Sequence, residues 1–75
     1  MLNLRDTRLN EGLTMQQLID KSGLTRATVR NAEKGTNVSY VSAVRIVKAL
    51  NELSGKSYTV DELGIKTSDH SEHAS

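Results

Sequence analysis

The 75-residue chain is long enough for one small domain, and its core must be thin, because a domain of this size leaves much of its surface exposed. It contains no cysteine, no apolar run of about 18 residues and no leader pattern. The sequence therefore predicts no disulfide, no thiolate metal site, no membrane span and no export signal. The absence of Pro, Phe and Trp disfavours a β-sandwich or barrel and favours an all-α fold.

The formal net charge of +1 conceals an uneven distribution. Residues 1–48 hold eight Lys and Arg against four Asp and Glu, a net charge of +4, and residues 49–75 hold two against five, a net charge of −3. A basic body favours a polyanionic partner only weakly, because an ordinary solvated surface explains the same charges.

Capping residues and glycines predict five helices joined by short turns. All 5 glycines stand where a helix should end, and a Ser, Thr or Asn stands where each helix should begin. The predicted caps are Asn3, Thr14, Thr25, Ser39 and Thr59, and the helices end at Gly12, Gly23, Gly35, Gly55 and Gly64. Thr14 with Gln17, and Thr59 with Glu62, have the spacing of capping boxes.

The helix predicted from Tyr40 to about Leu53 is rich in β-branched residues, which also suit a strand. Its apolar residues Ala43, Val47 and Leu50 recur at helical spacing over a segment too long for a typical strand, which favours a helix. Beyond Ile65 the sequence is polar and without apolar period. We therefore expect a domain over residues 1–65 and a flexible tail over residues 66–75.

The segment from Thr25 to Lys34 carries the most concentrated chemical face of the chain. Val29 and Ala32 are predicted to point inward, and the outward residues are Arg26, Ala27, Arg30, Asn31 and Lys34. Arginine offers a bidentate fork to guanine, asparagine offers one to adenine, and an alanine methyl can pack on a thymine methyl. A solvated helix face without a ligand is the alternative explanation.

Several residues at fixed spacings resemble the Cro/C1-type helix-turn-helix domain of phage repressors and of the xenobiotic-response-element family of regulators. The resemblance covers residues 4–65 and rests on Arg8, the Gly12-Leu13-Thr14 turn, Leu18, Gly23, Thr25, Val29, Glu33, Gly35, Asn37 and the helix with Val44, Val47 and Leu50. It implies a compact five-helix, lambda-repressor-like fold whose second and third helices form the helix-turn-helix. The chain departs from the family at Met15, where a Gln is common.

The resemblance also implies site residues. The expected base-contacting residues are Arg26, Ala27, Arg30 and Asn31, and Arg8 is expected to pair with Glu33 as a buried ion pair, two exposed charges being the alternative. Phosphate contacts are expected at the start of the second and fourth helices and beside the third. These residues are Thr14, Gln16, Gln17, Lys34, Asn37, Ser39 and Tyr40.

The predicted function is that of a sequence-specific regulator of transcription that binds double-stranded DNA, most simply a repressor. It is expected to be cytoplasmic and encoded by a bacterium or a phage. The expected operator is pseudo-palindromic. One way to occupy it is a homodimer through residues 53–63, where an apolar patch of Leu53, Tyr58 and Val60 is expected; an excised domain or dependence on a second protein are the alternatives. No enzyme activity, cofactor or metal is predicted, because Asp69, His70, Ser71 and His73 lie in the expected tail. The alternative is a protein-interaction module of the same fold, antitoxin-like or an adaptor.

Overall fold

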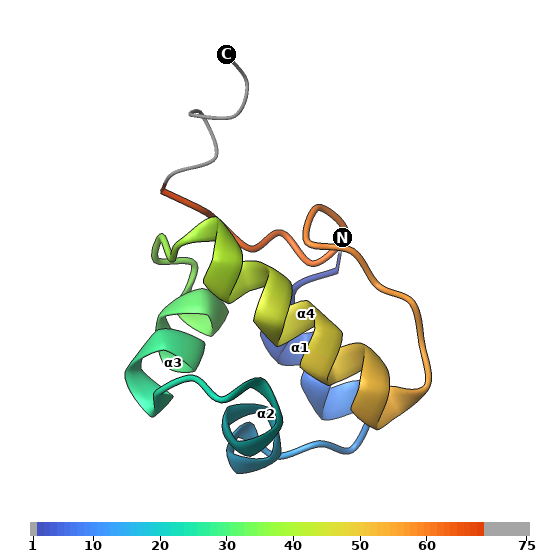
Figure 1. The fold of residues 1–75 in the computed structure, drawn as a ribbon. Coiled ribbons are helices and arrows are strands. Elements are labelled where there is room, and N and C mark those ends of the chain that lie inside the picture. The colour runs from blue at the N-terminus through green and yellow to red at the C-terminus, as the bar shows by residue number, and fades with distance from the viewer. Residues whose placement is uncertain (1, 69–75) are drawn as a thin grey trace.

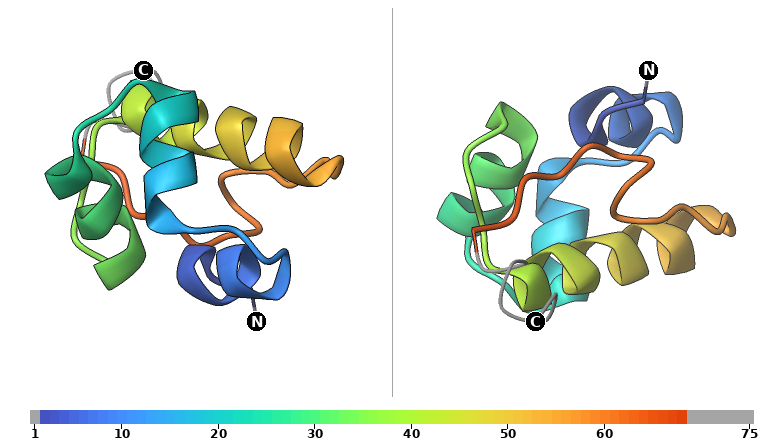
Figure 2. Two further views of the ribbon diagram at one scale, coloured as in Figure 1. Left: turned by 90° about the horizontal axis from the view of Figure 1, so that it is seen from below. Right: turned by 90° about the horizontal axis from the view of Figure 1, so that it is seen from above.

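The computed structural model describes residues 2–68, which form four helices. The helices are α1 (Leu4–Asn10), α2 (Met15–Ser22), α3 (Arg26–Lys34) and α4 (Tyr40–Ser54). In Figure 1, α4 crosses in front of α1, α2 lies below them, and α3 stands at the side. α2 packs against both α3 and α4, and the view from below in Figure 2 shows it between them. The prediction of an all-α domain is confirmed.

The predicted helix starts are confirmed by capping hydrogen bonds. Asn3 Oδ1 accepts from the Asp6 amide at 2.8 Å, and the hydroxyls of Thr14, Thr25 and Ser39 accept from the third amide that follows each, at 3.1 to 3.2 Å. Gly23, Gly35 and Gly55 end α2, α3 and α4 in the left-handed conformation, which glycine adopts at least cost.

The predicted fifth helix is wrong, although its capping box forms. The Thr59 amide donates to Glu62 Oε1 at 3.0 Å, and the Glu62 amide donates to Thr59 Oγ1 at 3.1 Å. Only a turn follows over residues 60–64, because Gly64 leaves the right-handed region (φ 64°) before a second turn can add hydrogen bonds. The described residues thus contain four helices and one capped turn.

The β-branched segment is a helix, as predicted, because its apolar residues lie on the face of α4 that covers the core. Ala43, Ile46 and Leu50 are fully buried there. They pack with Leu4 of α1, Leu18 of α2 and Val29 of α3, and with Leu63 and Ile65 from the C-terminal segment. Every helix therefore contributes to one core, and the C-terminal segment closes it.

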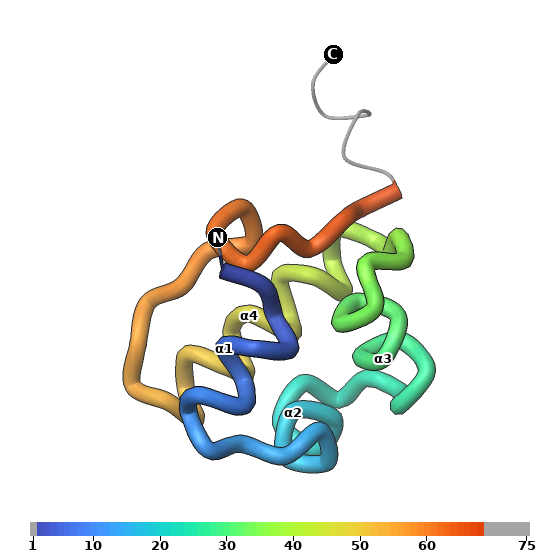
Figure 3. Tube along the Cα trace, turned by 180° about the vertical axis from the view of Figure 1, so that it is seen from behind, coloured from blue at the N-terminus to red at the C-terminus, as the bar shows by residue number. Residues whose placement is uncertain are grey.

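The C-terminal segment continues in contact with the domain beyond the predicted boundary. It runs from the end of α4 across the top of the molecule toward α3 (Figure 3). There the Val38 amide donates to the Lys66 carbonyl and the Ser68 amide donates to the Val38 carbonyl, each at 3.0 Å, in a single parallel bridge. The tail predicted from Lys66 is thus held by backbone hydrogen bonds as far as Ser68, and Asp69, His70, Ser71 and His73 lie outside the described residues.

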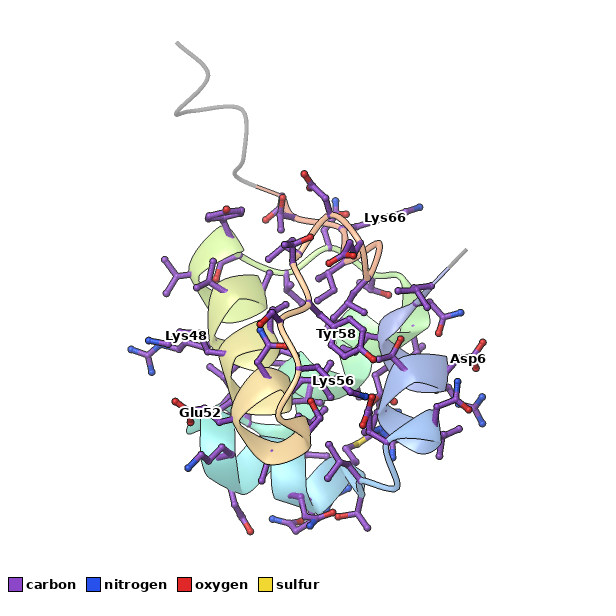
Figure 4. The ribbon with its side chains drawn as sticks, turned by 90° about the vertical axis from the view of Figure 1, so that its right-hand side faces the viewer. Asp6, Lys48, Glu52, Lys56, Tyr58 and Lys66 are labelled. Atoms are coloured by element: carbon purple, nitrogen blue, oxygen red, sulfur yellow. The ribbon has the colours of Figure 1, made fainter. Side chains whose placement is uncertain are left out.

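Glu11 fastens the start of this segment to the end of α1. Its Oε2 accepts from Lys56 Nζ and from the Tyr58 hydroxyl, both at 2.8 Å, and Figure 4 shows Lys56 and Tyr58 directed toward α1. Asn51 of α4 adds two hydrogen bonds to the Tyr58 backbone, at 2.8 and 3.0 Å. The two donors to Glu11 hold the pKa of its carboxyl below the ordinary value of 4.5, the Lys56 hydrogen bond being the larger cause.

We expect this cluster to make stability depend on pH. Because the folded pKa of Glu11 lies below 4.5, its contribution is present above that pH and is lost as the pH falls through the folded value. Denaturation midpoints measured from about pH 7 to about pH 2 should fall less steeply for Glu11→Gln than for the wild type. Glu52→Gln, which removes a carboxylate from an exposed ion pair with Lys21, is the control for net charge. Identical slopes for Glu11→Gln and the wild type would contradict the role of Glu11.

Candidate nucleic-acid interface

The turn between α2 and α3 fixes how the two helices meet. Gly23 takes φ 74°, and its amide donates to the Ile19 carbonyl at 3.0 Å, so the chain leaves α2 sharply. Ser22 Oγ then accepts from the Leu24 amide at 3.3 Å, and Leu24 packs on the core. Thr25 opens α3 immediately afterward, so α3 begins at the surface with its first residues exposed.

The two faces of α3 differ sharply in burial and charge. Val29 is 0 % exposed and Ala32 4 %, whereas Arg26, Ala27, Arg30 and Lys34 are exposed. Asn31, predicted to point outward, is half-buried, because it lies at the edge of the face that packs on the core. The outer face therefore presents three cations, an alanine methyl and a partly accessible amide along one surface helix.

Glu33, the one acidic residue of α3, is turned away from this face and pairs with Arg8 of α1. Glu33 Oε2 accepts from Arg8 Nε at 2.6 Å and Oε1 from Nη2 at 3.2 Å, with side-chain exposures of 10 % for Arg8 and 4 % for Glu33. Arg8 Nη1 also donates to the Leu13 carbonyl at 2.9 Å. The pair that the resemblance implies is thus present, and it is bidentate and buried. It joins α1 to α3 and to the turn before α2.

The residues predicted to contact phosphate are all exposed, but several already make hydrogen bonds. Thr14 and Gln17 close the capping box of α2, with the Thr14 amide donating to Gln17 Oε1 at 2.7 Å. Ser39 caps α4, and its Oγ lies 2.9 Å from the Ser42 Oγ. Lys34 ends α3, Tyr40 begins α4, and Asn37 lies in the turn between them. The start of α2 thus lies beside Arg26, and the start of α4 follows the end of α3 after a short turn.

The structure shows contacts of Arg26 that the sequence did not predict. Arg26 Nη2 donates to Gln16 Oε1 at 2.5 Å, and Nη1 lies 3.7 Å from Met15 Sδ. Gln16 Nε2 in turn donates to Asp20 Oδ1 at 2.8 Å. Gln16 and Asp20 stand four residues apart on α2, a spacing that allows such a pair, but only the packing of α3 on α2 brings Arg26 to it.

Residues 2–68 contain neither a group of metal-binding side chains nor a membrane-spanning helix. No group of three His, Asp or Glu side chains there is placed to hold a metal ion. In the same part of the chain, no helix is both long enough and apolar enough to cross a bilayer.

The apolar patch predicted for dimerisation is partly covered. Leu53, Tyr58 and Val60, on which that prediction depended, are half-buried and pack against the core. The large apolar side chains that the described residues expose lie elsewhere, at Leu2, Leu9, Tyr40 and Val41. These three residues therefore offer a partly exposed surface, and dimer formation through residues 53–63 stays a prediction.

A comparison with family models decides the family of the chain. A helix-turn-helix model matches residues 4–55, which span α1 to α4 and include the buried ion pair and the outer face of α3. The chain belongs to the Cro/C1-type helix-turn-helix family. Neither the comparison with curated proteins nor that with solved structures gave a match.

Membership of the Cro/C1-type helix-turn-helix family indicates a DNA-binding regulator of transcription, with double-stranded DNA as its partner. Families of this kind are typically not enzymes. The matched region ends at Gly55, so the segment that carries Lys56, Tyr58 and the bridge to Val38 follows it.

Proposed function

We propose that this protein is a sequence-specific transcriptional repressor that places α3 in the major groove of a pseudo-palindromic operator. The outer face of α3 carries the proposal: Arg26, Ala27 and Arg30 are exposed together, while the acid of the same helix is buried against Arg8. A helix with an exposed face of this kind fits the major groove, and its side chains match base edges chemically.

The surroundings of α3 supply groups for phosphate contacts. The α2 and α4 starts carry polar caps at Thr14 and Ser39, and Lys34 stands at the C-terminal end of α3. Exposed amides at helix starts and a lysine ammonium are groups that bind phosphate without distinguishing bases. We assign to Thr14, Gln17, Lys34, Asn37, Ser39 and Tyr40 the role of placing α3 in register.

Binding of two copies to two half-sites explains repression more simply than binding of one copy. A single domain of this size contacts few phosphates and about half of a typical site, and two-fold related copies match a pseudo-palindrome. Occupation of a promoter by such a pair blocks transcription without any further domain.

Selection of bound duplexes from a random pool, at two salt concentrations, tests this function. We expect an enriched pseudo-palindrome with half-sites about one helical turn apart, retained at the higher salt. An enriched single half-site would support specific binding and contradict the paired arrangement. Binding without enrichment that disappears at the higher salt would leave only charge attraction and would favour a protein-interaction module.

A further inference from the structure

Side chains of α2 hold Arg26 through a chain of hydrogen bonds. Asp20 Oδ1 accepts from Gln16 Nε2 at 2.8 Å, and Gln16 Oε1 accepts from Arg26 Nη2 at 2.5 Å. Met15 Sδ touches the other terminal nitrogen of the guanidinium at 3.7 Å. Met15 and Gln16 of α2 therefore contact Arg26 of α3, and Asp20 holds Gln16.

Asp20 determines which end of the Gln16 amide faces Arg26. A carboxylate accepts hydrogen bonds and cannot donate them, so it attracts the NH₂ end of the amide and repels the oxygen. The oxygen is then left for the guanidinium, which can only donate. A rotated amide would place oxygen against carboxylate and NH₂ against guanidinium, and both contacts would be lost.

We propose that Asp20 is a positioning residue for base recognition: through Gln16 it orients the Arg26 guanidinium and so sets the preference for the base pair that Arg26 contacts. This inference rests on the proposed function. An arginine whose orientation is set before binding loses less side-chain freedom when it meets a base, so the gain appears as specificity. It also assigns Gln16 to holding Arg26, in place of the phosphate contact predicted from the sequence.

Removing Asp20 should have opposite effects through charge and through Arg26: it should raise affinity through charge and lower base specificity through Arg26. The proposal is therefore testable. An acid beside a DNA-binding face repels phosphates, so removing Asp20 should strengthen binding to every duplex if charge alone matters. If Asp20 acts through Arg26, Asp20→Ala should instead weaken discrimination at one base pair, whatever happens to overall affinity.

The experiment measures affinities for the selected duplex and for a set of its single-base-pair variants. For Asp20→Ala we expect the preference at one position to fall by about fivefold or more, at the same position where Arg26→Ala loses preference. Asp20→Asn should retain most of the preference, because the Asn oxygen still accepts from Gln16. In the Arg26→Ala background, Asp20→Ala should change no base preference further.

Glu52→Ala is the matched control, since it removes an exposed acid of α4 that pairs with Lys21 of α2, and Figure 4 shows Glu52 on the outer side of α4. Its base preferences should equal those of the wild type. The proposal is overturned if Asp20→Ala leaves the base preference unchanged at every position, or if it lowers the preference at all positions equally. It is also overturned if Asp20→Asn loses as much base preference as Asp20→Ala.

A second measurement separates this proposal from the proposed function. Side-chain NMR of the free protein should show altered Gln16 amide and Arg26 guanidinium signals in Asp20→Ala and near-normal signals in Asp20→Asn. Unchanged signals in Asp20→Ala would overturn the chain of contacts itself. Altered signals in a protein that enriches no duplex would support the contacts, while overturning the proposed function and with it the role of Asp20 in specificity.

Discussion

Replacing Arg26 and Asn31 together by Ala is expected to abolish sequence-specific DNA binding while leaving the fold intact. Each good side-chain contact to a base edge contributes about 1–3 kcal/mol of discrimination, so two per half-site contribute about 2–6 kcal/mol. Ala favours helix at least as well as the residues replaced, so far-UV circular dichroism should be unchanged. Titration of the selected duplex against a scrambled one measures the loss.

Arg5→Ala is the charge-matched control for Arg26, because it removes an arginine of α1 that is 62 % exposed. It should reduce affinity for both duplexes slightly and equally, through the lost charge alone. Lys34→Ala should likewise weaken binding to both, with a smaller salt dependence. If the double variant still preferred the selected duplex, α3 would not be the element that distinguishes bases.

Arg8→Ala is expected to lower the free energy of unfolding by about 3–5 kcal/mol, because it leaves a buried carboxylate without a partner. Glu33 is only 4 % exposed, and the Leu13 carbonyl would lose its hydrogen bond from Arg8 at the same time. A loss of this size is a large part of the stability of a small domain, so urea denaturation should show it directly.

The double variant Arg8→Met with Glu33→Leu separates two quantities: the net contribution of the pair to the free energy of unfolding, and the loss caused by leaving one partner unpaired. It removes both charges and fills similar space, so its stability should lie much closer to that of the wild type than Arg8→Ala does. A loss below about 1 kcal/mol for Arg8→Ala would show that water reaches Glu33 and that the pair behaves as an exposed one.

The helices and their faces could be predicted because they depend on neighbouring residues. A capping hydroxyl bonds an amide three residues away, a glycine ends the helix in which it stands, and burial on α4 follows a helical period. The inward direction of Val29 and the outward direction of Arg26 follow from the same period. The Arg8–Glu33 pair joins residues 25 positions apart and was implied by the resemblance to the family, not by a local pattern.

The fifth helix was predicted wrongly, and the contacts that the sequence did not predict join segments far apart in the chain. The cap at Thr59 formed locally, but only one turn follows it before Gly64. Glu11 and Val38 hold the segment from Lys56 to Ser68 across long stretches of sequence, and no local pattern encodes such contacts. The residues that had suggested a dimer surface pack partly against the core, and dimer formation through them stays a prediction.

The sequence by itself determined four helices, their caps, the polar face of α3 and the family, because hydrogen bonds and apolar periods within a few residues specify them. Only the tertiary structure decided that Arg26 meets Gln16 and that the C-terminal segment is held to the end of α1. The physical reason is that side chains on different helices meet only where packing of the core places them, and that placement depends on the whole chain.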